Sequence, residues 1–218
     1  MAQRTPDREY IPPVQTLQLR YAKRGRMRFA SHRDFQRAWE RALRRVQVPM
    51  AYSAGFTPHP KVSYLGAAPT GAASEAEFLE FSVVHKVDPA ELASALDAAL
   101  PDGLDIVGIV DGQSLSLQAS RWRLEFPVPV AQAVTAFEAA ESVEVERITK
   151  AGRRVIDVRA LCSDLELDGQ VLEITVTHAE PTPRPAEVVK ALGFEDLPVL
   201  ATRLAQGEPV PGGVRCPF

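Results

Sequence analysis

The chain has few of the residues on which metal, redox and disulfide chemistry depend. Cys162 and Cys216 are the two cysteines in 218 residues. This count excludes a framework of several disulfides, and the spacing matches no zinc or iron–sulfur motif. The four histidines, at positions 32, 59, 85 and 178, have no metal-ligand spacing either. We therefore expect no metal site and no bound cofactor.

Long apolar segments are also missing. No apolar run approaches the roughly 18 residues that a membrane-spanning helix needs. Residues 1–15, MAQRTPDREYIPPVQ, have no apolar centre of the kind found in signal peptides. The small-residue stretch 66–74, GAAPTGAAS, lacks the Gly-Lys-Ser/Thr ending of a phosphate-binding loop. A soluble, cytoplasmic protein without membrane contact is expected.

Acidic residues are scarce near the N-terminus, although the net charge of the whole chain is only −3. Residues 1–61 carry 13 lysines and arginines against 4 aspartates and glutamates, a surplus of nine positive charges. The remaining residues carry 12 against 24. Such an asymmetry predicts a polyanion or an acidic surface as the partner of the basic part.

The order of the predicted elements indicates the α+β class, with two tandem ferredoxin-like (βαββαβ) domains. Alternating apolar residues predict a strand over 14–23, which residues 27–29 continue or pair with after a turn. The rest of the first domain is predicted as a helix over 31–47, strands near 61–66 and 77–87, a helix over 88–100 and a strand over 104–110. A similar order recurs in the second half of the chain.

These patterns divide the chain into five parts. The parts are a flexible N-terminal arm (1–13), a basic ferredoxin-like domain (14–112), a linker (113–119), a second ferredoxin-like domain (120–206) and a flexible tail (207–218). Each predicted domain has about a hundred residues, which is a common domain size.

The predicted helix at 31–47 has two distinct faces. Ser31 is a favourable N-cap, and an apolar stripe follows at helical spacing. The stripe consists of Phe35, Trp39, Ala42, Leu43 and Val46. Arginines recur at every fourth position on another face, at Arg33, Arg37, Arg41 and Arg45, with Arg44 beside them. Only two acids, Asp34 and Glu40, accompany these arginines, so the helix lacks the usual alternation of opposite charges.

The loop that follows, SAGFTPHPKVSY (53–64), is stiffened by two prolines. Pro58 and Pro60 fix their own φ and favour extended geometry in the residues before them. Gly55 is suited to a turn with positive φ. The loop carries His59 and Lys61, with Tyr52 and Tyr64 at its two ends. We interpret it as a rigid wall beside the basic helix.

Residues 19–63 resemble the DUF2344 family, the radical SAM-linked proteins. The resemblance rests on YAKRGRMRF (21–29), on the Ser31-His32-x-Asp34 helix start, on the arginine-rich helix and on residues 52–61. Pro183-Arg184-Pro185 and Thr202-Arg203 resemble later markers of the family. Thr57 stands where the family pattern has Asn, and Arg33 where it has an apolar residue. The resemblance implies a B12-type radical SAM protein as partner, and it implies no activity for the chain itself.

The favoured function is binding of RNA, with tRNA as one candidate, in support of a radical SAM enzyme. The planar guanidinium group of arginine is suited to bind phosphate. Ferredoxin-like sheets commonly bind RNA. If single-stranded RNA contacts about five of these charges, the logarithm of its affinity should fall with the logarithm of the salt concentration with a slope near −3.5. Arg184 and Arg203 are expected to add charge from the second domain. The predicted RNA-binding residues are Arg20, Lys23, Arg24, Arg26, Arg28, Arg33, Arg37, Arg41, Arg44, Arg45, His59, Lys61, Arg184 and Arg203.

Two alternatives remain open. In the first, the chain is a metal-independent endoribonuclease, similar to the CRISPR repeat-processing enzymes, with His32, His59, Tyr52 and Lys61 as candidate catalytic residues. One histidine would act as general base on a 2′-hydroxyl while a second acid protonates the leaving oxygen. In the second, the basic face docks the radical SAM partner directly and binds no RNA. Two cysteines cannot supply the three-cysteine cluster of a radical SAM enzyme, so that chemistry belongs to the partner.

Overall fold

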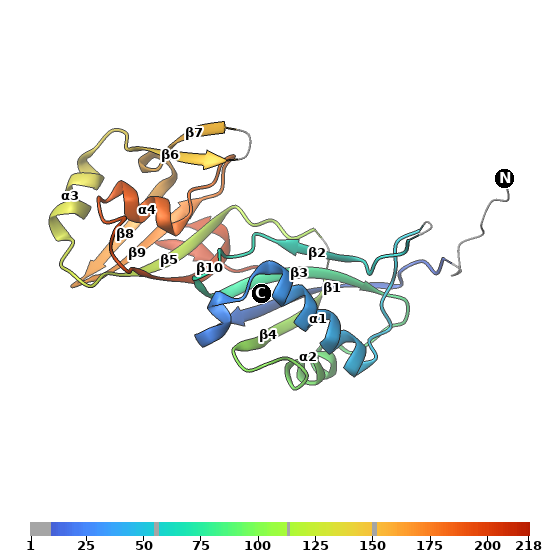
Figure 1. Cartoon of the computed structure of the whole chain (residues 1–218). Coiled ribbons are helices and arrows are strands. Elements are labelled where there is room, and N and C mark those ends of the chain that lie inside the picture. Colours follow the sequence, from blue (N-terminus) through green and yellow to red (C-terminus); the bar gives the residue numbers. More distant parts are fainter. Residues whose placement is uncertain (1–9, 55–56, 113, 150–151) are drawn as a thin grey trace. The chain divides into compact units, whose positions relative to one another are not determined.

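The computed structural model describes residues 10–54, 57–112, 114–149 and 152–218. It confirms the α+β class: four α-helices and a mixed set of strands are present in the described residues (Figure 1). Its contacts divide the chain into two units. The first unit comprises the residues up to 70, residues 77–115 and residue 218, and the second comprises residues 71–76 and 116–217.

The first unit has the element order β-α-β-β-α-β. Its elements are β1 (Gln15–Lys23), α1 (His32–Val46), β2 (Val62–Leu65), β3 (Ala73–Val83), α2 (Pro89–Asp97) and β4 (Leu104–Asp111). The strands lie in the order β4-β1-β3-β2, with β1–β4 and β2–β3 antiparallel. The first residues of β3 count with the second unit. Both helices pack on one face of this sheet and share one core with it (Figure 1).

Helix α1 begins where the sequence predicts, because its first turn is capped from both sides. Ser31 Oγ accepts the backbone N–H of Asp34 at 3.2 Å, and the Asp34 carboxylate accepts the backbone N–H of Ser31 at 3.1 Å. This reciprocal pair is a capping box. The hydrogen bonds from Ser31 hold the pKa of Asp34 below its usual value, so the cap is charged at neutral pH.

The apolar stripe of α1 is buried against the strands. Trp39 is fully buried and meets Phe81 of β3 edge to face, with ring centroids 5.6 Å apart. Phe35 stacks on Tyr21 of β1 at 4.3 Å. The predicted faces of the helix are therefore confirmed, with the apolar stripe turned inward and the arginines exposed.

The end of α1 has an unusual residue in its terminating turn. Gln47 adopts the left-handed conformation, with φ of 58°. Its backbone N–H reaches the carbonyl of Arg44 at 3.2 Å, and that of Val48 reaches the carbonyl of Leu43 at 3.0 Å. This is the Schellman pattern, in which glycine is the favoured residue because it has no Cβ.

One local prediction in the first unit is wrong. Residues 27–29 neither continue nor pair with the preceding strand; they lie in a 3-10 helix, η1 (Gly25–Phe29). Gly25 takes a φ of 52°, and the Met27 N–H then bonds to the carbonyl of Arg24 at 2.9 Å. Met27 thereby packs against the core rather than extending along an edge.

The second unit contains more strands than the predicted βαββαβ order. Its elements are β5 (Ala119–Glu125), α3 (Ala131–Ala139), β6 (Glu144–Thr149), β7 (Gly152–Asp157), the 3-10 helix η2 (Arg159–Leu161), β8 (Cys162–Asp168), β9 (Val171–Thr177), α4 (Pro185–Ala191), β10 (Leu200–Val210) and β11 (Gly213–Arg215). The main strands lie in the order β10-β5-β9-β8, whereas β6 and β7 form a separate two-stranded sheet. Residues 207–218, expected as a flexible tail, include the end of β10 and all of β11.

Two polar clusters organise the second unit. Arg147 of β6 forms a bidentate ion pair with Glu187 of α4. It also donates to the carbonyl of Thr182 at 2.7 Å. His178 lies between Ser120 Oγ at 2.8 Å and the carbonyl of Leu117 at 2.7 Å. Burial lowers the pKa of His178, so the ring is held neutral. Both clusters link segments that are distant in the sequence.

Candidate functional site

The arginine face of α1 is the most prominent charged feature of the first unit. We use this name for Arg33, Arg37, Arg41 and Arg45, which are all exposed. Successive members are separated by about 6 Å along the helix axis, since each residue rises 1.5 Å. Among the described residues, no carboxylate lies within ion-pair distance of any of the four. The face is therefore a row of uncompensated positive charges that winds around the helix by about 40° per step.

The two acids of α1 do not neutralise this face. The Asp34 carboxylate is engaged in the N-terminal cap, and Arg37 only adds to the lowering of its pKa. Glu40 pairs with Arg44 one turn later, at 3.9 Å. Arg44 is thus the one arginine of this helix with a recorded ion pair in the described part of the chain.

Positive charge and an aromatic ring lie just before α1. Arg26 is exposed and Arg28 is half-buried in η1. The Arg28 guanidinium sits 4.6 Å from the centre of the Phe29 ring, which is 60% exposed. An exposed aromatic ring beside a cation suits the stacking of an unpaired base.

Three other predicted binding residues are engaged elsewhere. Arg20 lies between Leu19 and Tyr21, whose side chains enter the core, and it donates to the carbonyl of Phe218 at 3.2 Å. Lys23 is only 5% exposed, with its ammonium group near the carbonyls of Ala68 and Pro69. Arg24 is exposed and pairs with Asp105 at 2.9 Å. Arg20 and Lys23 are thus held within the fold, whereas Arg24 lies at the surface in an ion pair.

Backbone pairing closes the proline-rich loop into a narrow antiparallel ribbon. We use the name ribbon for the described residues of the segment 50–60. Tyr52 and Pro60 form an antiparallel bridge, and the Ser53 N–H bonds to the carbonyl of His59 at 2.8 Å. In return, the His59 N–H donates to Ser53 Oγ at 3.0 Å. The His59 ring is exposed, whereas Lys61 is half-buried, with its ammonium 5.7 Å from the centre of the Tyr10 ring. The predicted turn at Gly55 lies outside the described residues.

The structure brings His32 to Tyr64 rather than to His59. The two rings meet edge to face with centroids 4.9 Å apart, and His32 Nε2 lies 3.1 Å from the side-chain nitrogen of Gln36. Burial, with a smaller contribution from the charge of Glu40, raises the pKa of Tyr64 to about 12. No contact recorded in the described residues joins His32 to His59 or to Lys61.

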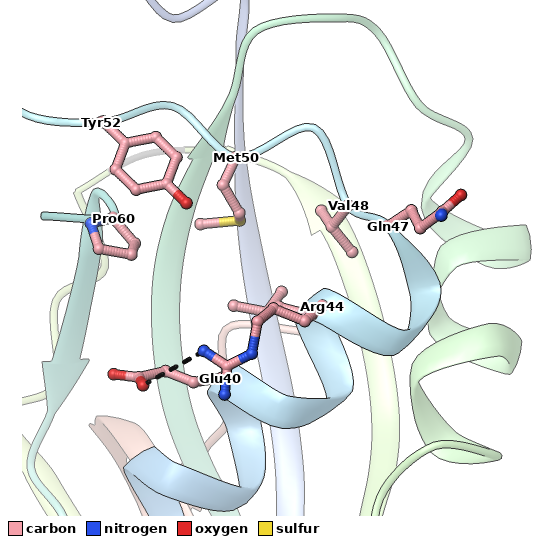
Figure 2. A pocket seen from close by; sticks show the side chains of 8 residues that line it. Glu40, Arg44, Gln47, Val48, Met50, Tyr52 and Pro60 are labelled. Carbon is pink, nitrogen blue, oxygen red and sulfur yellow. Dashed lines mark ion pairs between the residues drawn. The ribbon is translucent and has the colours of Figure 1, made fainter. Parts of the chain in front are cut away.

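A pocket of about 380 Å³ lies between the C-terminal end of α1 and this ribbon (Figure 2). Tyr52 and Pro60 lie on one side, and Glu40 and Arg44 lie on the other. The pocket is completed by Leu43, Gln47, Val48 and Met50. Sequence reasoning singled out Tyr52 and Arg44 but missed this enclosure, because it depends on the bridge between Met50 and Val83 that sets the path of the ribbon.

The two predicted arginines of the second unit differ from each other. Arg184 is exposed at the start of α4, where its backbone N–H donates to Glu187 at 2.6 Å. Arg203 is only 5% exposed; it donates to Gln206 at 3.0 Å and lies over the Trp122 ring at 4.8 Å. Arg203 is thus enclosed within its own unit.

Across the described ranges, no group of three or more His, Cys, Asp or Glu residues is arranged to hold a metal ion. Within the same ranges, no helix has the length and apolar character needed to cross a membrane. Burial raises the pKa of Cys162 to about 12, so that thiol is protonated and unreactive at neutral pH.

Comparison with known proteins identifies one family. Residues 16–185 match the family described as an uncharacterized protein conserved in bacteria, DUF2344. No curated protein matches the chain. Among solved structures, a crystal structure of an unknown protein from Galdieria sulphuraria matches with 17% identity and a TM-score of 0.28, over 90% of this chain and 99% of that one.

Proposed function

The chain belongs to the DUF2344 family of uncharacterised bacterial proteins, and from this premise we propose that it is an RNA-binding accessory protein. The first unit binds the RNA through α1, and tRNA is one candidate ligand. The chain positions this RNA for a partner enzyme and does not cleave it. The observation that carries the proposal is the uncompensated arginine face.

The electrostatics of α1 favour a linear polyanion over a compact acidic ligand. Like charges at i and i+4 destabilise a helix by about 0.2–0.5 kcal/mol per pair. The arginine face contains three such pairs, and a chain of phosphates would relieve all of them together. Arginine also binds phosphate through two parallel N–H groups, which lysine cannot do. The regular spacing of about 6 Å suits a repeating row of phosphates.

The partner of this RNA-binding unit is proposed to be a B12-type radical SAM protein. This assignment is supported by the resemblance of residues 21–61 to the radical SAM-linked family. The exposed His59 ring on the closed ribbon provides a rigid surface for that contact.

We further infer that both units are variations of the ferredoxin-like plan. In the first unit the strand order β4-β1-β3-β2 accompanies the order βαββαβ. When the separate β6–β7 hairpin is set aside, β5, α3, β8, β9, α4 and β10 follow the same order, and their strands lie as β10-β5-β9-β8. Apart from η2 and β11, the second unit then follows the plan of the first with one inserted hairpin, which supports a tandem arrangement.

The proposal is tested by purifying the protein in low salt and measuring its absorbance ratio at 260 and 280 nm. We expect a raised ratio that ribonuclease treatment lowers and deoxyribonuclease treatment does not. The released RNA should be intact, with no uniform new ends. A ratio typical of free protein, together with co-purification of a radical SAM protein, would favour the docking function; uniformly cut RNA would favour the nuclease.

A further inference from the structure

The pocket at the C-terminal end of α1 adjoins the arginine face and has no role in the proposal so far. We propose that it receives one unpaired base of an RNA strand whose phosphates lie along the arginine face. This inference rests on the proposed function and adds to it that the RNA is single-stranded where it meets α1. Glu40 and Arg44 line the pocket, and each follows a member of the arginine face, Arg37 or Arg41, by three positions. Residues three apart are neighbours on a helix surface, so the pocket borders the arginine face.

The apolar lining of the pocket suits the faces of a base. Tyr52 offers an aromatic ring, and Pro60 stands beside it on the same side (Figure 2). Val48 and Met50 form the remaining apolar lining together with Leu43. Stacking on an aromatic side chain is the usual way in which proteins hold unpaired bases. A volume of about 380 Å³ is large enough for a base and part of its ribose.

The polar lining suits the edge of a base. Glu40 presents acceptors and Arg44 presents donors. Gln47 can do either once its amide, which points away in Figure 2, turns toward the pocket. The ion pair between Glu40 and Arg44 is long, at 3.9 Å, and both side chains are at least half exposed. The pair can therefore open toward a base without first breaking a buried contact. Every unpaired base carries both donors and acceptors on its edge, and this lining offers both in return.

The conformation of Gln47 is an independent indication of a role for its side chain. The helix ends in a Schellman turn in which Gln47 has a φ of 58°, where glycine would be unstrained. A side chain retained in such a conformation marks a candidate functional position. Gln47 borders the pocket, and Figure 2 shows its amide directed away from Tyr52 and Pro60, so the amide would reach a base after a change of rotamer.

A pocket of this kind selects single strands. In a duplex, each base edge is paired and each base face is stacked, so a base can enter only after leaving the helix. The phosphates of a duplex can still meet the arginine face. We therefore expect duplex RNA to bind with a similar salt dependence but lower affinity.

The test uses a fluorescein-labelled single-stranded RNA of twelve nucleotides and the same sequence in a duplex. The wild type should bind the single strand about tenfold more tightly, as expected for one stacked base. Tyr52→Leu should remove most of this preference and leave the salt slope unchanged. Tyr52→Phe, which keeps the ring, should bind the single strand several-fold more tightly than Tyr52→Leu.

Gln47→Gly separates a loss of binding from a loss of folding. It relieves the left-handed strain, so its melting temperature should rise by a few degrees, while single-strand affinity falls about two- to tenfold through loss of the amide. Single-strand binding by Tyr52→Leu and Gln47→Gly equal to wild type, with the salt slope intact, would overturn this inference and leave the proposed function standing. No RNA binding by the wild type would overturn both.

Discussion

Glutamine at all four positions of the arginine face is expected to remove most of the RNA affinity and most of its salt dependence. Each phosphate contact with single-stranded RNA contributes about −0.7 to the slope of log affinity against log salt. Four contacts give a slope of about −2.8, which is a roughly 50-fold loss between 50 and 200 mM salt. The variant should bind weakly at both concentrations, with a slope near zero. Fluorescence anisotropy over a salt series measures both quantities.

The same variant should fold at least as well as the wild type. Removal of three repulsive i, i+4 pairs should stabilise α1 by about 1 kcal/mol in low salt, and glutamine forms helix about as readily as arginine. A matched control replaces Arg153 and Arg154 of β7, which are also exposed, with glutamine. That control should retain the RNA affinity and most of the slope. A four-fold variant that binds with an unchanged slope would refute the role of the arginine face.

Trp39→Ala is expected to cause the largest loss of stability among single substitutions in α1. The indole is fully buried between the helix and β3, against Phe81. Truncation of a buried tryptophan costs about 3–5 kcal/mol, because the surrounding core cannot collapse into the space. Since α1 carries the arginine face, RNA binding should be lost in parallel. Urea unfolding followed by circular dichroism measures the effect.

Trp39→Phe provides the contrast that identifies the cause. Trp39 Nε1 is buried and has no hydrogen-bond partner in the described part of the chain. Phenylalanine would lose some packing but would remove this unpaired N–H, whose burial carries a penalty of its own. We expect a cost below about 1.5 kcal/mol and retained RNA binding. If Trp39→Phe proved as unstable as Trp39→Ala, the result would indicate that the indole N–H makes a stabilising hydrogen bond, contrary to this interpretation.

The features that could be predicted from sequence are those that depend on neighbouring residues. Ser31 and Asp34 are three positions apart, so their capping box and the start of α1 are visible in the sequence. The same holds for the spacing of the arginine face. The strand predicted at residues 27–29 is wrong because so short an apolar segment fits either a strand end or a 3-10 turn. Only the packing of Met27 decides between them.

The features that could not be predicted depend on contacts between distant segments. Lys23 and Arg203 look like surface cations in the sequence, yet loop carbonyls at 68–69 enclose the first, and Trp122 and Gln206 enclose the second. The pocket likewise needs Met50, Tyr52 and Pro60 to lie beside the end of α1. Whether His32 and His59 meet could not be decided from the sequence; in the structure the His32 ring contacts Tyr64.

The central claim, that α1 is the RNA site, is tested most directly by photocrosslinking. The intact protein is irradiated with pooled small RNA containing 4-thiouridine, and crosslinked peptides are identified by mass spectrometry. Cleavage after acidic residues suits the analysis, because it keeps residues 41–75 in one peptide. We expect crosslinks in α1 and in the ribbon at 50–60. Crosslinks confined to the second unit, or none despite saturating RNA, would contradict the account.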